Sequence, residues 1–507
     1  MQSKIGSLPS FPAPTDGAVS RRKFLANSCF LAGAAAALSL PRRCTAAAVS
    51  SAAPFQLRRG APQNFFDDSM ISYQRRLIRR WLPAVVNSKP VLVSDQPWEG
   101  EIHLHGSVHA IPGGGYRMYY ASQGGVLVAE SADGLKWHKP ELDIVRWEGK
   151  PTNVIIDGLS PQRYWSVASI NVIHDEQDND FPFKMTTYQK PDKSKEGALY
   201  VYKSRDGLRF EAVPGPRFEM GDRNTMMGNR VNGKFVGHVR KVGMFKKYTG
   251  VRSMFYTESS DFLNWSEPQL ALAPGLQDEP DVEFYGMSVF ERHGWFIGLV
   301  EVWNGDTDSF HIELALSRDL RNWQRPQPRT PFIAPANGRF PSHCAGNGPV
   351  YLNEQMAFYF GGASAAHHHT TTTMEESVIG LASLELDRFC ALEGTTSQGW
   401  VDTVPLVWPG GDLVVNADTR ESFSSHPTNV NGELFVEVLD ASGAQLPKWT
   451  GKVNRAVFQG NTHCREKIHD GTVLWDGRRL DEFIGKTIRL RFVMKHARIF
   501  TYQASSV

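Results

Sequence analysis

The sequence lacks long apolar runs, a cysteine pattern suited to metal binding, and a helical repeat of apolar residues. A membrane-spanning helix needs about 18 to 20 consecutive apolar residues, and no segment after residue 48 contains them. Only five cysteines occur in 507 residues, and their spacing matches no zinc motif. Low-complexity tracts are also absent, while an apolar content of 41% is sufficient for packed cores. These absences argue against a multi-span membrane protein, a zinc-finger domain and a disordered chain.

The N-terminal segment is a candidate export signal. The letters RRKFL at 21–25 precede an Ala- and Leu-rich stretch and an Ala-x-Ala end at 46–48. Bacterial twin-arginine signal peptides contain these parts in this order. The sequence therefore predicts a signal over 1–48 and a mature chain that is periplasmic or secreted, without membrane attachment once the signal is removed. The arginine pair at 42–43 leaves an uncleaved membrane anchor as the alternative.

Removal of this signal changes the charge of the chain. The full sequence has a formal net charge of +2, but residues 1–48 hold six Lys and Arg and one Asp. The segment 49–507 therefore has 49 basic and 52 acidic residues, a net charge of −3. Nucleic-acid binding has no electrostatic support in this composition. Cys344, Cys390 and Cys464 remain, and no disulfide framework is expected because the twin-arginine route exports chains folded in the reducing cytoplasm.

A turn pattern occurs four times along the chain. In each copy a strand-like apolar run precedes a Ser-x-Asp turn, and an aromatic residue follows. The copies are VLVAESADGLKWHKP (126–140), LYVYKSRDGLRF (199–210), SMFYTESSDFLNW (253–265) and IELALSRDLRNW (312–323), with a weaker fifth copy, IGLASLELDRFCAL, at 379–392. The Asp positions are 73, 55 and 58 residues apart, and such periods, filled with strands, indicate propeller blades. Because Asp favours turns through hydrogen bonds to its own backbone, these Asp residues are predicted to be structural.

The predicted fold is all-β, a five-bladed β-propeller followed by a C-terminal β-sandwich. The propeller is placed at 99–405, after a lead-in segment at 49–98. Residues 412–507 contain alternating strands and hairpin turns without the repeat, which favours a separate sandwich. The segment MISYQRRLIRRWL at 70–82 is either a helix or a strand lying across the propeller edge.

The blade turns carry a family resemblance. Through SADGLKW and its copies the chain resembles the five-bladed β-propeller glycoside hydrolases: the invertase and levansucrase group, the arabinanases and xylosidases, and the mannoside phosphorylases. The resemblance covers most of 60–400 and implies a carbohydrate substrate. The chain looks like a member of an exported bacterial branch of these proteins. The Trp-Met-Asn-Asp-Pro, Arg-Asp-Pro and Glu-Cys motifs of invertases are missing. No catalytic residue is therefore carried over from the family.

The innermost strands of a propeller converge on one funnel, so carboxylates on these strands are the candidate catalytic groups. Glycoside hydrolysis needs two carboxyl groups, one protonated and one ionised. In the segment 278–290, Asp281 and Glu283 alternate, and both are expected to face the funnel, with Tyr285 beyond them as a substrate contact. The alternative is a solvated loop before the strand.

Five further residues complete the carboxylate hypothesis. Asp222 is the second expected catalytic carboxylate, with Arg223 and Asn224 as contacts to the substrate. The alternative is that Asp222 is an ordinary turn aspartate. Glu101 lies on the first inner strand, and Glu301 follows the apolar stretch WFIGLV. Glu301 is either a buried catalytic group or an outward-pointing residue at a strand end.

Histidines offer a competing hypothesis. His103 and His105 share one face of a strand, His343 lies on the fifth inner strand, and a triple His occupies 367–369. An H-x-H pair with a distant ligand is a legitimate metal geometry, although a strand His more often contacts a sugar hydroxyl or packs in a core. No cofactor and no metal are expected, and a divalent metal at the funnel histidines is the alternative.

Three functions follow from these residues. The leading one is an exported glycoside hydrolase that uses a carboxylate pair in the propeller funnel. The second is a metal-dependent sugar lyase or isomerase that uses the histidines. The third is a carbohydrate-binding propeller without catalytic activity.

Overall fold

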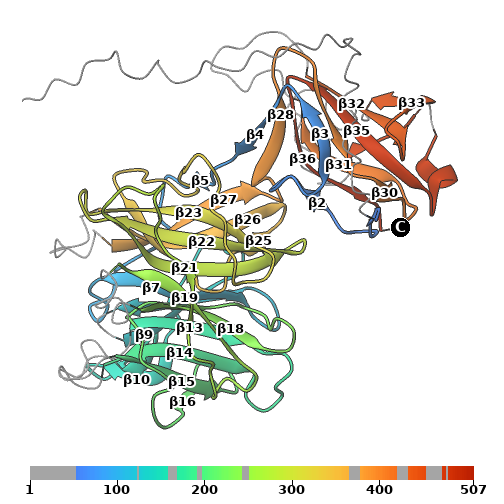
Figure 1. The fold of residues 1–507 in the computed structure, drawn as a ribbon. Helices are drawn as coiled ribbons and strands as arrows, with labels where there is room; N and C mark the ends of the chain where they lie inside the picture. The colour runs from blue at the N-terminus through green and yellow to red at the C-terminus, as the bar shows by residue number, and fades with distance from the viewer. Residues whose placement is uncertain are drawn as a thin grey trace, which may run out of the picture. The chain divides into compact units, whose positions relative to one another are not determined.

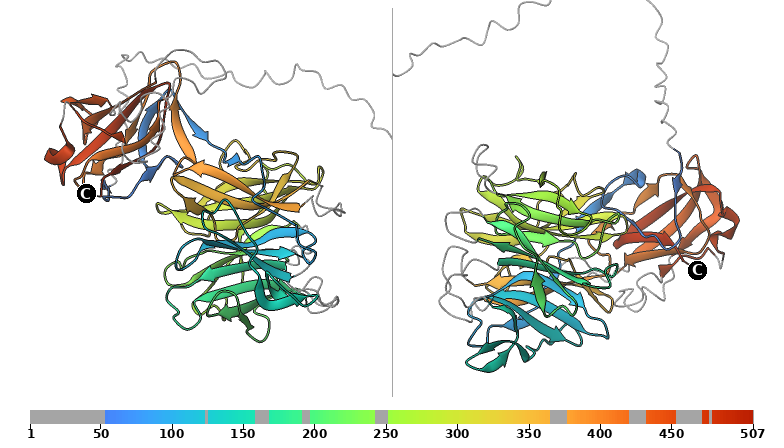
Figure 2. Two further views of the ribbon diagram at one scale, coloured as in Figure 1. Left: turned by 180° about the vertical axis from the view of Figure 1, so that it is seen from behind. Right: turned by 90° about the horizontal axis from the view of Figure 1, so that it is seen from below.

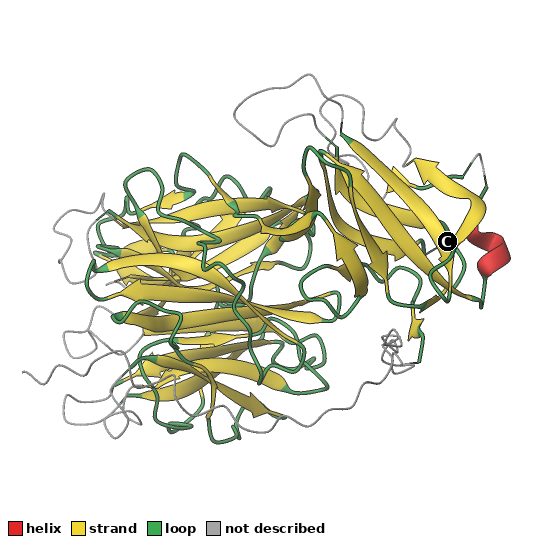
Figure 3. Cartoon of the chain, turned by 45° about the horizontal axis from the view of Figure 1, so that its top comes forward, coloured by secondary structure: helices red, strands yellow, loops and turns green. Residues whose placement is uncertain are grey.

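Strands build almost the whole molecule (Figure 3). The computed structural model describes residues 53–122, 125–157, 168–190, 197–241, 251–364, 377–419, 432–452, 471–475 and 478–506. Within these ranges a single 3-10 turn, η3 (Leu480–Phe483), is the only helical element, which confirms the predicted all-β class. No helix in the described ranges has the length and apolar content to cross a membrane. The predicted signal, Cys464 and the triple His lie outside the described residues.

Five antiparallel sheets make up the first part of the molecule (Figure 1). Their strands are β7 (Ile102–Ala110), β8 (Tyr116–Ser122), β9 (Gly125–Ser131) and β12 (Val154–Asp157) in sheet 1; β13 (Ala168–His174), β14 (Phe183–Gln189), β15 (Ala198–Ser204) and β16 (Phe210–Ala212) in sheet 2; β17 (Asn224–Met226), β18 (Phe235–Lys241), β19 (Ser253–Ser259) and β20 (Gln269–Leu272) in sheet 3; β21 (Val282–Arg292), β22 (Trp295–Asn304) and β23 (Ser309–Ser317) in sheet 4; and β24 (Phe340–Cys344), β25 (Val350–Leu352), β26 (Gln355–Ala363) and β27 (Ser377–Glu385) in sheet 5. A separate hairpin joins β10 (Leu142–Trp147) and β11 (Lys150–Thr152).

The five sheets lie against one another in both further views (Figure 2), and contacts between their inner strands close them into a ring. The inner strand of each sheet contacts the next, β7 with β13, β13 with β17, β17 with β21, β21 with β24, and β24 with β7. This arrangement is a β-propeller with the five sheets as its blades. Two short strands from the predicted lead-in, β5 (Val85–Val86) and β6 (Leu92–Val93), pair with the outer side of β27. Part of the 49–98 segment therefore belongs to the fifth sheet, where it covers an edge that would otherwise be unpaired.

The repeated turn has the same hydrogen bonds in each of its four copies. In each, Oδ1 of the aspartate (Asp133, Asp206, Asp261 or Asp319) accepts from the backbone N–H groups two and three residues later, at 2.7–2.9 Å. These backbone hydrogen bonds lower the pKa of Asp261 and of Asp319 to about 2. The indole of Trp265 or Trp323 closes its turn by donating to a carbonyl at 2.9 Å. The repeat therefore encodes a local fold, as predicted.

A second pair of sheets shares one apolar core. One sheet contains β1 (Phe55–Gln56), β3 (Ile71–Arg75), β29 (Gly399–Thr403), β30 (Leu406–Val407), β32 (Glu433–Asp440), β33 (Gln445–Lys452) and β35 (Thr487–Lys495), and the other contains β2 (Gln63–Asn64), β4 (Leu77–Trp81), β28 (Cys390–Gly394), β31 (Leu413–Asp418), β34 (Gly471–Thr472) and β36 (Ala497–Ala504). Side chains of both sheets, including Leu406, Val436 and Tyr502, pack together, so the two sheets form a β-sandwich.

The sandwich extends beyond the predicted range of 412–507. Strands from 55–81 and from 390–407 pair with those of the C-terminal segment. The segment 70–82 consists of two strands, β3 and β4, with the backbone of Arg76 at φ 57° between them. It is not a helix, and its strands belong to the sandwich sheets rather than to the propeller edge.

A buried histidine in the third sheet is expected to make the propeller sensitive to acid. His238 on β18 lies edge-on to Tyr256 and Trp323, and neither ring nitrogen has a hydrogen-bond partner among the described residues. Burial lowers its pKa from 6.5 to about 3. Between these two values the unfolded chain binds the proton and the folded chain does not, so the free energy of unfolding falls as the pH falls.

Replacement of His238 by Phe is therefore expected to weaken this pH dependence. Between about pH 7.5 and pH 5 the wild-type protein should lose about 2 kcal/mol more than the His238→Phe variant. Denaturant unfolding at the two pH values measures the difference. His138→Phe, at an exposed position, is the control that should behave as wild type. Equal pH dependence in wild type and His238→Phe would contradict the expectation.

Candidate functional site

Three histidines and a glutamate lie together on or beside the inner strands β7 and β24 of two neighbouring sheets. Glu101 directly precedes β7, and its carboxylate is 3.6 Å from Nε2 of His103. The rings of His103 and His105 are stacked with their centroids 5.5 Å apart. His105 in turn meets the edge of His343 on β24, with centroids 4.0 Å apart. The two predicted histidine positions of β7 and the one of β24 are thus brought together.

Tyr285 on β21 joins this histidine group to two arginines. Its ring centroid is 5.6 Å from that of His343. The guanidinium of Arg240, at the end of β18, lies 4.0 Å from the same ring centroid, and that of Arg252, directly before β19, lies 5.3 Å away. Cations near an aromatic face are attracted by its quadrupole. Tyr285 therefore connects sheets 3, 4 and 5 at one place.

Each of these arginines holds one of the predicted carboxylates. Arg240 forms an ion pair with Asp222, which precedes β17, and Arg252 forms one with Glu283 on β21. The Asp222 and Glu283 side chains are 36% and 19% exposed, so both are within reach of a ligand. At neutral pH a carboxylate in such a pair accepts hydrogen bonds and protons but donates none.

The site cluster is defined here as the set that these contacts link. It contains Glu101, His103, His105, Asp222, Arg240, Arg252, Glu283, Tyr285 and His343. Seven of these nine residues were predicted from the sequence. Arg240 and Arg252 were missed, because neither is on an inner strand and an arginine at a strand end is ordinarily exposed.

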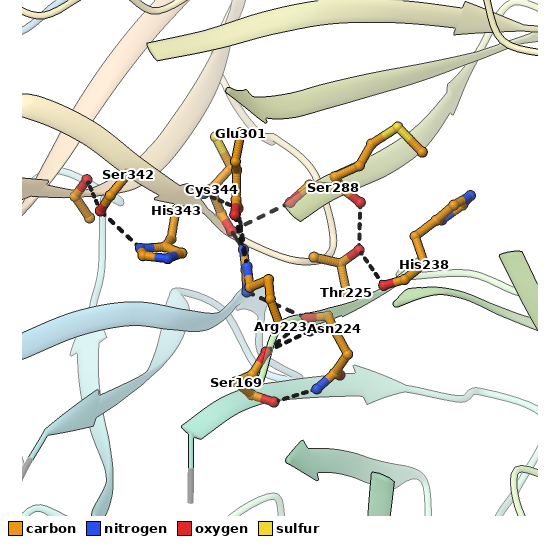
Figure 4. Close-up of polar contacts among 12 residues, drawn as sticks. Ser169, Arg223, Asn224, Thr225, His238, Ser288, Glu301, Ser342, His343 and Cys344 are labelled. Carbon is orange, nitrogen blue, oxygen red and sulfur yellow. Dashed lines mark hydrogen bonds and ion pairs between the residues drawn. The ribbon is translucent and has the colours of Figure 1, made fainter. Parts of the chain in front are cut away.

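A fully buried ion pair lies among the inner strands (Figure 4). Nε of Arg223 is 3.0 Å from Oε2 of Glu301, and both side chains are at most 1% exposed. Both residues also bind the backbone of Cys344. Arg223 donates to the Cys344 carbonyl at 2.9 Å, and the Cys344 N–H donates to the Glu301 carboxylate at 3.1 Å. A Cβ at Gly286 would lie 2.2 Å from Oε2 of Glu301, so only glycine leaves space for the pair.

The burial of these residues argues against three predicted roles. Glu301 was expected to be a catalytic candidate and Arg223 a substrate contact, but each is saturated by the other and by Cys344, with no surface left for a substrate. Asn224 is also completely buried. Its side chain donates to the carbonyl of Ser169 at 2.8 Å (Figure 4) and accepts from the hydroxyl of Thr186 at 2.9 Å. Arg223 and Asn224 therefore connect blades instead of binding sugar.

Asp281 is the remaining predicted carboxylate. It is exposed and precedes β21, and its backbone carbonyl accepts from the N–H of Gly305 at 2.8 Å. No described contact links its side chain to the site cluster. The strand begins at Val282, so the period-2 alternation places Glu283 and Tyr285 in the cluster but does not extend to a residue outside the strand.

Metal binding has no complete ligand set in the described part of the chain. No group of three or more His, Cys, Asp and Glu side chains within it has a geometry that could hold a metal ion. The triple His at 367–369 is outside that part.

The fold and the site cluster define a β-propeller whose inner strands present carboxylates, histidines and an aromatic ring at one place. No protein-family model matches the chain, and no curated protein matches it. Among solved structures, the chain is similar to a thermostable family-43 glycoside hydrolase at 16% identity, over 58% of this chain and 93% of that one, with a TM-score of 0.44.

Two further solved structures show a similar level of likeness. An N-acetylgalactosamine deacetylase from F. plautii, in complex with blood group B trisaccharide, has 14% identity, covers 62% of this chain and 97% of its own, and has a TM-score of 0.41. A beta-1,2-mannobiose phosphorylase from Listeria innocua has 12% identity, covers 62% and 98%, and has a TM-score of 0.41.

Proposed function

We propose that this protein is a glycoside hydrolase whose reaction takes place at the site cluster. One observation carries the proposal: the site cluster contains three partly exposed carboxyl groups, that of Glu101 beside His103 and those of Asp222 and Glu283, which are held by arginines that contact the ring of Tyr285. Two carboxyl groups on either side of a scissile bond are the requirement of glycoside hydrolysis. The partly exposed His103 and the ring of Tyr285 would contact the sugar.

The roles of the carboxyl groups follow from their partners. Hydrolysis needs one protonated carboxyl group to assist the leaving group and one ionised group to act as nucleophile or base. Asp222 and Glu283 both pair with an arginine, which suits the ionised role. Among the described members of the site cluster, Glu101 is the one carboxyl group without an arginine partner. We therefore assign the proton donor to Glu101 and the ionised role to Asp222 or Glu283.

The test is hydrolysis by the purified protein of a panel of aryl glycosides and of plant and algal oligosaccharides, with and without a chelator. Turnover that survives the chelator supports the carboxylate mechanism. Turnover lost to the chelator would replace it with a metal-dependent lyase or isomerase at the histidines. Binding of an oligosaccharide without turnover would identify a carbohydrate-binding propeller instead.

We also propose that the protein is exported, on the basis of the twin arginine at 21–22 and the segment that follows it. Replacement of both arginines by lysine is expected to leave the protein in the cytoplasm. Fractionation of the producing cells, with immunodetection in each fraction, measures this. Unchanged amounts outside the cytoplasm would contradict the proposal.

A further inference from the structure

Arg240 is buried with an incomplete set of hydrogen bonds. Its side chain is 4% exposed and forms the ion pair with Asp222. Nε and Nη1 are buried without a hydrogen-bond partner among the described residues, and the guanidinium lies over Tyr285. Burial lowers its pKa, against the opposing effect of Tyr285, while Arg252 and Glu301 are the other charged groups that face it.

Arg230, which follows β17 in the same blade, provides a matched comparison. It too pairs with an aspartate, Asp175, and lies over an aromatic ring, that of Phe235, at 3.8 Å. All of its guanidinium nitrogens are satisfied: Nε and Nη2 donate to Asp175 at 3.1 and 2.9 Å, and Nη1 donates to the carbonyls of Gly233 and Ser260 at 2.9 and 3.0 Å.

The two arginines therefore differ in what they contribute to stability. A buried donor without an acceptor costs the desolvation of that group, and the cost is larger for a charged group. Removal of one partner of a buried ion pair is destabilising where it leaves the other charge buried. Asp175, the partner of Arg230, is 3% exposed, whereas Asp222, the partner of Arg240, is 36% exposed and stays partly hydrated when the arginine is replaced. Arg230, with all of its donors satisfied, is expected to stabilise the fold. Arg240, with two buried donors unsatisfied, is expected to lower the stability of the fold. Proteins commonly retain such residues for function at a cost in stability.

We infer that Arg240 is a positioning residue, which orients Asp222 and the ring of Tyr285 for the reaction and is retained at a cost to the stability of the fold. The assignment rests on the proposed function. Because its side chain is buried, Arg240 acts through these two neighbours and does not touch the substrate. Its loss should therefore lower kcat and change KM little.

The experiment compares Arg240→Met, Arg240→Lys and the control Arg230→Met in kcat, KM and melting temperature. Arg240→Met is expected to lower kcat about a hundredfold, the effect of a misplacement of about 1 Å, with a melting temperature equal to or above that of wild type. Arg240→Lys retains a cation for Asp222 and should recover at least about tenfold of this loss. Arg230→Met should keep wild-type kcat and melt several degrees lower.

Each outcome decides the inference. A melting temperature of Arg240→Met as low as that of Arg230→Met, with unchanged kcat, would show a structural arginine and overturn it. A lysine variant as inactive as the methionine variant would overturn the orientation of Asp222. If the wild-type protein hydrolyses nothing, the proposed function fails. The melting temperatures then still test whether Arg240 costs stability. An Arg240→Met variant as stable as wild type supports that part of the inference, and one destabilised like Arg230→Met overturns it.

Discussion

Glu283→Gln is expected to lower kcat by about a thousandfold on any glycan that the wild-type protein cleaves. Glutamine keeps the size of the side chain but removes the negative charge that a nucleophile or general base requires, a contribution of about 10² to 10⁴ in rate. Asp222→Asn is expected to have a loss of similar size if it carries the same role. Steady-state kinetics on the hydrolysed substrate measures both.

The control for this substitution lies on the same strand. Glu291 is exposed at the far end of β21, and Glu291→Gln makes the same chemical change outside the site cluster. It should keep wild-type kcat and stability. A Glu283→Gln variant whose kcat stays within about threefold of wild type would remove Glu283 from the mechanism.

Glu101→Gln separates the proton donor from the ionised carboxylates. An acid assists departure of the leaving group, so its removal matters least for aryl glycosides whose leaving group departs readily as an anion. Glu101→Gln should therefore lose far more activity on oligosaccharides than on such aryl glycosides. Equal losses on both substrates would assign the proton donor elsewhere, and His103 would be the next residue to replace.

The second large effect concerns the buried pair. Arg223→Met is expected to lower the free energy of unfolding by about 3–5 kcal/mol, because it leaves the Glu301 carboxylate buried without its partner. Denaturant unfolding measures this loss, and the double variant Arg223→Met/Glu301→Met should regain much of it, since no unpaired charge is then buried. A loss below about 1 kcal/mol in the single variant would mean that the pair is solvated.

The position of this pair explains why it should matter to the whole propeller. Arg223 precedes β17, Glu301 is on β22 and Cys344 ends β24, so three consecutive blades meet in one set of hydrogen bonds. Gly286 gives the pair its space. This set of hydrogen bonds also holds two residues of the site cluster in place, because Asp222 is adjacent to Arg223 and His343 is adjacent to Cys344 in the chain.

Local patterns in the sequence were sufficient for the sheets and for part of the site. The Ser-x-Asp turn forms its hydrogen bonds within a few residues, so its recurrence reveals the blades without knowledge of the rest of the chain. Alternation along a strand placed Glu283 with Tyr285, and His103 with His105, on common faces. These are short-range relations, which a single segment of sequence contains in full.

Burial and long-range pairing were decided only by the tertiary structure. Arg223 and Glu301 read as catalytic or substrate-binding residues in the sequence because charged side chains are rarely buried, yet they neutralise each other across 78 positions. The pairing of β4 with β28 and of β5 with β27, which gives the N-terminal segment to both domains, has no local signal either. The sequence by itself thus determined the all-β class, the blade repeat and most of the candidate site. The three-dimensional contacts decided which charges are buried in pairs and which stay exposed, because burial and pairing depend on partners far apart in the chain.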